Sequence, residues 1–144
     1  MSDHSVISDA NLLAQFSQMY RNAMDTFMDE VGMHRGQASV LCQVVKQDGI
    51  TQTEIAEALS VQGATITNML KRMEESNLIV RRRDAQDNRL VRVYATATGV
   101  EQEISITKQL KSLEDSILNG ISTADREVLR RVVWQMIGNI EKHG

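Results

Sequence analysis

Residues 51–96 read TQTEIAEALSVQGATITNMLKRMEESNLIVRRRDAQDNRLVRVYAT, and their patterns decide the fold. Near the start of this stretch, Thr51 or Thr53 can accept a free backbone N–H group as the N-cap of a helix. The apolar residues that follow recur at helical spacing: Ile55, Ala56 and Leu59. A short helix is therefore predicted here.

A second helix follows, with one apolar and one polar face. The apolar series is Val61, Ile66, Met69, Leu70 and Met73. The opposite face carries Gln62, Thr65, Asn68, Lys71 and Arg72. Such side chains reach base edges and phosphates when a helix enters the major groove of DNA. Asn77 stands where this helix should stop, because Asn tolerates the left-handed conformation that often ends helices.

The end of the stretch predicts a β-hairpin. Residues 78–83 and 90–96 are rich in Val, Ile, Leu and Tyr, and residues 84–89 contain the Asp and Asn typical of a turn. From Lys71 to Arg92 there are seven Lys or Arg against four acids, although the whole chain has a formal net charge of −3. Basic charge is thus concentrated on the hairpin and the helix before it, as a nucleic-acid surface requires.

Two helices followed by a charged hairpin form a winged helix-turn-helix, and the stretch resembles the multiple antibiotic resistance regulator (MarR) family of bacterial transcription factors. The resemblance rests on TQTEIAEAL, on ATITNMLKRMEESNLIVRR, and on Asp87-Asn88-Arg89 followed by Val91, Val93, Thr96 and Gly99. Asn77 replaces the usual glycine, and Ala95 replaces a larger apolar residue. The resemblance implies a mainly α fold with a small β-hairpin wing, and with N- and C-terminal dimerisation helices.

The resemblance also implies a DNA-binding surface. Arg89 matches the wing-tip arginine that the family places in the minor groove, and Asp87 could hold it by a bidentate pair. The predicted DNA-binding residues are Gln62, Ala64, Thr65, Thr67, Asn68, Lys71, Arg72, Arg81, Arg83, Asp87 and Arg89. Two alternatives remain, namely a solvated polar helix face and an Arg89 that only pairs with acids in its own turn. Because strand side chains alternate, Arg81 and Arg83 share one face and Arg82 takes the other.

The ends of the chain carry more apolar surface than the winged helix-turn-helix core can cover. We predict dimerisation helices at about residues 8–30 and 98–142, around a winged helix-turn-helix core at about residues 34–96. Ser8 or Asp9 should start the first helix, Thr98 or Thr96 should cap the one after the wing, and Ser122 with Asp125 forms a capping box for the last helix. One domain, residues 1–144, and a homodimer are the simplest interpretation.

Composition limits the class of protein. The 144 residues, 42% hydrophobic and 24% charged, suit one globular domain. No apolar run approaches a membrane span, and MSDHSVISD has no signal pattern, so a cytoplasmic location is expected. No motif of an enzyme occurs, and His4, His34 and His143 are too dispersed for a metal site. We therefore predict no enzymatic activity, no cofactor and no metal.

The resemblance also implies a small-molecule effector. Family members commonly bind small, often anionic aromatic molecules, and a soft apolar region with one cation could suit such a ligand. Its residues are Met24, Phe27, Met33, His34 and Arg35. The other interpretation of these residues is dimer core plus a surface loop. Cys42, the single cysteine, is expected to be a small buried hydrophobe.

The predicted function is that of a homodimeric regulator, a repressor of nearby genes that binds a pseudo-palindrome in double-stranded DNA and is released by a small effector. Two alternatives stay open. One is a winged-helix module for protein interaction without DNA binding, and the other is a redox sensor that uses Cys42.

Overall fold

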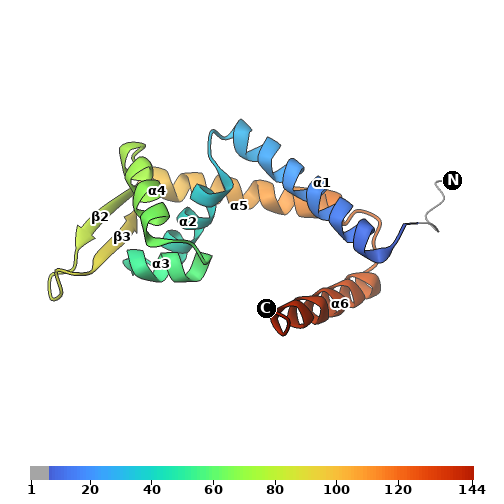
Figure 1. Cartoon of the computed structure of the whole chain (residues 1–144). Coiled ribbons are helices and arrows are strands. Elements are labelled where there is room, and N and C mark those ends of the chain that lie inside the picture. The colour runs from blue at the N-terminus through green and yellow to red at the C-terminus, as the bar shows by residue number, and fades with distance from the viewer. Residues whose placement is uncertain (1–6) are drawn as a thin grey trace. The chain divides into compact units, whose positions relative to one another are not determined.

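The computed structural model describes residues 7–144 (Figure 1). The elements are α1 (Asp9–Glu30), α2 (Arg35–Lys46), β1 (Ile50–Thr51), α3 (Gln52–Leu59), α4 (Gly63–Glu75), β2 (Ile79–Arg83), β3 (Val91–Ala95), α5 (Ala97–Ile117) and α6 (Thr123–Glu141). This confirms the mainly α fold with a hairpin wing. The chain divides into two compact units, one up to Ile106 and one from Thr107 to Gly144. The signal-peptide prediction and His4 involve residues 1–6, which lie outside the described range.

Helix α3 begins with a capping box. The Glu54 amide donates to Thr51 Oγ1 at 3.2 Å, and the Thr51 amide donates to Glu54 Oε2 at 2.9 Å. Thr51, not Thr53, is therefore the N-cap. The hydrogen bonds from the Thr51 backbone and side chain lower the pKa of Glu54.

Helix α4 packs by one face and exposes the other. Ile66, Leu70 and Met73 are fully buried, as the apolar series predicts. Val61 precedes the helix and is exposed, because the chain turns through a left-handed Ser60 before α4 begins. Asn77 has φ 59°, which confirms the left-handed residue expected after the helix.

The sheet has three strands in the order β1-β3-β2, all antiparallel. The hairpin pairs Ile79 with Ala95 at its base and Arg83 with Val91 towards its tip. Strand β1 was not predicted, because a strand of two residues is too short to show an alternation of apolar and polar side chains. Its pairing of Ile50 with Val93 ties the wing to the turn between α2 and α3.

Helix α5 starts against the end of α4. Thr96 Oγ1 accepts from the Gly99 amide at 3.0 Å and donates to the Asn77 carbonyl at 2.6 Å. Of the two caps considered, Thr96 is therefore the one used, and Thr98 lies inside the helix. Gly99 is buried, and a Cβ there would lie 2.0 Å from the Leu78 carbonyl oxygen.

Helices α1 and α6 each leave an apolar face exposed. Ser8 caps α1 and Ser122 caps α6, as predicted. The exposed apolar residues of α1 are Leu12, Leu13, Phe16, Met19 and Tyr20. Those of α6 are Val128, Leu129, Val132, Val133, Trp134, Ile137 and Ile140, with Trp134 67% exposed. None of the described helices is long and apolar enough to cross a membrane.

Candidate nucleic-acid interface

The outer face of α4 is polar and open to solvent. Thr65, Asn68 and Arg72 lie three and four residues apart, so they form one stripe along the helix. Ala64 and Lys71 flank this stripe, and all five side chains are exposed. These residues were predicted from sequence to face DNA, and the structure places them together on one accessible surface.

Thr67 differs from its neighbours because its hydroxyl is already used inside the protein. Thr67 Oγ1 donates to the Gly63 carbonyl at 3.0 Å and accepts a hydrogen bond from Gln52 Nε2. Gln52 is the first residue of α3, so this contact joins the two helices of the motif. Gln52 was missed from sequence, since no spacing rule pairs residues of different helices.

The wing tip is organised by an ion pair. Arg89 is 90% exposed, and its Nε and Nη2 atoms lie 3.0 Å from Asp87 Oδ1 and 3.1 Å from Oδ2. This confirms the bidentate pair predicted for these residues. The Arg89 side-chain and backbone hydrogen bonds lower the pKa of Asp87, and the same side-chain bond raises the pKa of Arg89. The guanidinium is thus oriented while its remaining N–H groups face solvent.

A second ion pair anchors the wing where the turn leaves strand β2. Asp84 Oδ1 accepts from the Gln86 and Asp87 amides at 2.8 and 2.9 Å, and Oδ2 accepts from Arg92 Nε. Arg92 Nη1 also donates to the Gly49 carbonyl at 2.9 Å. Hydrogen bonding from Arg92, and then from the Asp87 and Gln86 amides, lowers the pKa of Asp84 to about 2. Arg92 thereby connects the hairpin to the turn after α2.

The strand arginines already have partners within the chain. Arg81 Nη2 lies 3.3 Å from Glu74 Oε1, and Arg83 Nη1 donates to the Asn88 carbonyl at 2.7 Å. Arg82 lies over the Tyr94 ring, 5.8 Å from its centroid. The DNA contacts assigned to Arg81 and Arg83 stay predictions, and both side chains also stabilise the wing.

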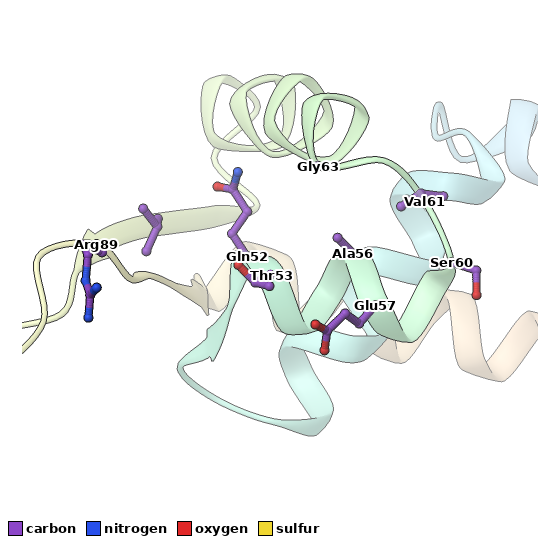
Figure 2. Close-up of a pocket in the computed structure, with 9 residues that line it drawn as sticks. Gln52, Thr53, Ala56, Glu57, Ser60, Val61, Gly63 and Arg89 are labelled. Carbon is purple, nitrogen blue, oxygen red and sulfur yellow. The ribbon is translucent and has the colours of Figure 1, made fainter.

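An open cleft of about 440 Å³ connects α3, the start of α4 and the wing (Figure 2). Gln52 and Thr53 line it from α3, Gly63 from α4, and Arg89 from the wing. Glu57 adds an acid to the same cleft. The Arg89 guanidinium and the start of α4 therefore border one accessible space.

The five residues predicted to bind an effector do not share one environment. Met33 is only 5% exposed, and Met24 and Phe27 are half-buried. Arg35 Nε pairs with Asp25 Oδ1 at 2.7 Å. His34 instead lines a small cavity against α4. The assignment of these residues to an effector stays a prediction.

Cys42 is half-buried in α2. Burial, and then the charge of Glu103, raise the pKa of its thiol. This disfavours the thiolate that a redox sensor requires. Within residues 7–144, no group of three His, Cys, Asp or Glu side chains is placed to hold a metal ion.

Comparison with known proteins agrees with this architecture. The MarR family model matches residues 33–91. The chain is 27% identical to the transcriptional regulator HosA of Escherichia coli over 124 residues, which cover 85% of this chain and 92% of HosA. It is 30% identical to the transcriptional repressor MdtR of Bacillus subtilis over 99 residues, covering 68% of this chain and 64% of MdtR.

A solved structure extends the likeness to the fold. The chain superimposes on Staphylococcus aureus MepR in its complex with DNA with a TM-score of 0.80, at 25% identity, covering 93% of this chain and 99% of that one. These relatives are transcription regulators and not enzymes. The chain belongs to the MarR family of winged helix-turn-helix transcriptional regulators.

Proposed function

We propose that this regulator is a homodimer that binds a pseudo-palindromic operator in double-stranded DNA and represses nearby genes. The observation that carries the proposal is the pairing of Arg89 with Asp87 at the wing tip, beside an exposed polar face on α4. An exposed guanidinium that is oriented but not neutralised on all sides suits a phosphate-lined minor groove. The complex of MepR with DNA supports this mode of binding in a protein of the same fold.

In the proposed complex, α4 enters the major groove and the wing follows the adjacent minor groove. Gln62, Ala64, Thr65, Asn68 and Lys71 face bases or phosphates, and Arg72 contacts phosphate. Thr67, which is bonded to Gln52, contributes mainly by holding α4 on α3. The two copies of a dimer would read half-sites about one helical turn, ~10 bp, apart.

The proposed homodimer covers the apolar faces of α1 and α6. Phe16 and Tyr20 stack on α1 with ring centroids 6.2 Å apart, yet both rings are exposed within the chain. Burying a Leu or Phe side chain contributes about 1.5–3 kcal/mol, so two such faces can stabilise an obligate dimer. Leu13→Asp and Leu129→Asp should convert the protein to monomers in sedimentation velocity experiments, whereas Gln15→Asp, at a polar position of α1, should not.

Release by a small effector and repression complete the proposal. Repression is supported by MdtR, which is named a repressor. An effector that binds where the dimerisation helices meet the winged helix-turn-helix core would change the distance between the two α4 helices of the dimer. A ligand titration in which no anionic or aromatic compound alters DNA affinity would contradict this part of the proposal.

The central experiment measures affinity for the DNA upstream of the protein's own gene as a function of salt. Wild type should show a steep negative slope of log K against log salt, about −0.9 for each phosphate neutralised. Arg89→Ala should weaken binding and reduce the slope. Lys108→Ala, which removes a charge from an exposed position of α5, is the matched control and should bind like wild type.

If a folded wild-type dimer showed no salt-dependent affinity for that DNA or for a randomised duplex pool, DNA regulation would be rejected. The result would then favour the protein-interaction module. Rapid modification of Cys42 at neutral pH with loss of DNA affinity would favour the redox sensor.

A further inference from the structure

A small cavity lies beside the recognition helix, on the side of α2. It has a volume of about 170 Å³ and is lined by His34, the N-cap residue of α2, by Gln37 from α2, and by Asn68, Met69 and Arg72 from α4. The Met69 side chain reaches from α4 towards α2 here, since a Cβ on Gly36 would lie 3.0 Å from Met69 Cε. The cavity therefore lies between the start of α2 and the exposed side of α4.

The polar groups in this cavity have no partners in the part of the chain that the structure describes. No hydrogen bond or ion pair joins the side chains of His34, Gln37, Asn68 or Arg72 to another described residue. His34 is the N-cap residue of α2, and its side chain makes no capping hydrogen bond. This contrasts with Arg89, whose guanidinium is paired with an acid. The cavity thus presents unused donors around one uncompensated cation.

Its size and chemistry indicate the class of ligand. Pockets for drug-sized molecules measure about 300–1,000 Å³, so a cavity of about 170 Å³ is too small for them. An arginine guanidinium with amide and imidazole donors suits a single tetrahedral oxyanion. A phosphate group fits these requirements, and Met69 supplies an apolar wall.

The position of the cavity indicates the source of that phosphate. Asn68 and Arg72 belong to the same stripe as Thr65, on the face of α4 proposed to meet DNA. Thr65 and Arg72 are seven residues apart, roughly 10 Å along the helix axis. The major groove is about 12 Å wide, so Arg72 would reach the groove wall, where phosphates lie, when Thr65 is among the bases.

We propose that this cavity binds one phosphodiester of the DNA backbone at the edge of the major groove. Arg72 supplies the charge, and His34 and Gln37 supply donors from α2, which brings a third helix into the DNA interface. The inference rests on the proposed DNA-binding function and adds to it a phosphate site that fixes the position of α4 in the major groove. Because phosphate contacts carry no base information, the site contributes affinity and not sequence preference.

The test combines variants with modified DNA. Gln37→Ala and His34→Ala should each reduce affinity about threefold to tenfold per half-site, equally for the operator and for a random duplex. Arg72→Ala should also lower the magnitude of the salt slope by about 0.9 per half-site. Gln43→Ala, the same change on another face of α2, is the control, and circular dichroism melts verify that each variant is folded.

A duplex series with a single neutral methylphosphonate at each backbone position identifies the contact. At one position per half-site, wild type should lose affinity and Gln37→Ala should lose clearly less, whereas Arg89→Ala should remain additive with that same position. Wild-type binding with a normal salt slope but no coupled position would overturn the phosphate site and leave the proposed function intact. Absence of wild-type binding would overturn both.

Inorganic phosphate distinguishes a free anion from the DNA backbone as the ligand. Wild type and Gln37→Ala are titrated with inorganic phosphate while the Arg72 side-chain resonances are followed by NMR. Millimolar binding that Gln37→Ala abolishes, without any coupled methylphosphonate position, would assign the cavity to a free phosphate and overturn the DNA contact.

Discussion

Gly99→Ala is expected to destabilise the protein severely. The added Cβ would lie 2.0 Å from the Leu78 carbonyl oxygen and 3.0 Å from its carbonyl carbon. Both atoms belong to backbone, so no side-chain rotation can relieve the overlap. Restoring a carbon–oxygen separation near 3.3 Å requires the start of α5 and the segment between α4 and β2 to separate by roughly 1.3 Å.

That displacement affects the contacts that join the two segments. The Thr96 amide donates to the Leu78 carbonyl at 3.0 Å, and the Thr96 hydroxyl donates to the Asn77 carbonyl at 2.6 Å. Losing these bonds costs about 1 kcal/mol each, and overpacking adds about 1–3 kcal/mol. The expected loss in unfolding free energy is therefore about 3–5 kcal/mol, a large part of a typical 5–15 kcal/mol.

Urea denaturation followed by circular dichroism measures this difference, at one protomer concentration because the proposed dimer makes stability concentration-dependent. Gly63→Ala is the matched control, since a Cβ there would meet nothing within 4 Å. Its unfolding free energy should change by less than about 1 kcal/mol. A Gly99→Ala protein with the wild-type midpoint would refute the reasoning.

Three further predictions concern charged and thiol groups of the winged helix-turn-helix core. The pKa of Asp84 is about 2 in the folded state against 3.8 for the free side chain, so its stabilising contribution is present above pH 3.8 and is lost as pH falls towards 2. Asp84→Asn should flatten that part of a plot of thermal midpoint against pH, and an unchanged plot would argue against the Arg92 contact. Asp87→Ala should weaken DNA binding less than Arg89→Ala does, because it frees the guanidinium without removing it; equal losses in an anisotropy titration would contradict an orienting role. Cys42, whose pKa is raised, should react with iodoacetamide at pH 7 more slowly than a free cysteine, and faster alkylation would contradict its described environment.

Much of the fold could be predicted because its signals are local. The caps at Ser8 and Ser122, the left-handed Asn77 and the hairpin each depend on residues within a few positions of one another. The pair between Asp87 and Arg89 is also local, and the structure confirms it. Two local signals competed at Thr96 and Thr98, and the structure shows that Thr96 is the cap, since its hydroxyl accepts from the Gly99 amide and donates to the Asn77 carbonyl.

The candidate site was less predictable wherever a side chain meets a distant segment. Thr67 has the polar character of a DNA contact, yet its partner Gln52 comes from another helix. Arg81 reads as a wing cation, but it is paired with Glu74 on α4. Charge and periodicity identify such residues as exposed and polar, and they do not say which partner each one finds.

By itself the sequence determined the order of the helices and the two hairpin strands, the polar face of α4 and the basic wing, because helical and strand periodicity arise from neighbouring residues. Only the tertiary structure decided that β1 pairs with β3, that Arg92 reaches Gly49, and that His34 and Arg72 line one cavity. These contacts join residues far apart in the chain. Their partners are selected when helices pack and strands pair, and no local pattern specifies that packing.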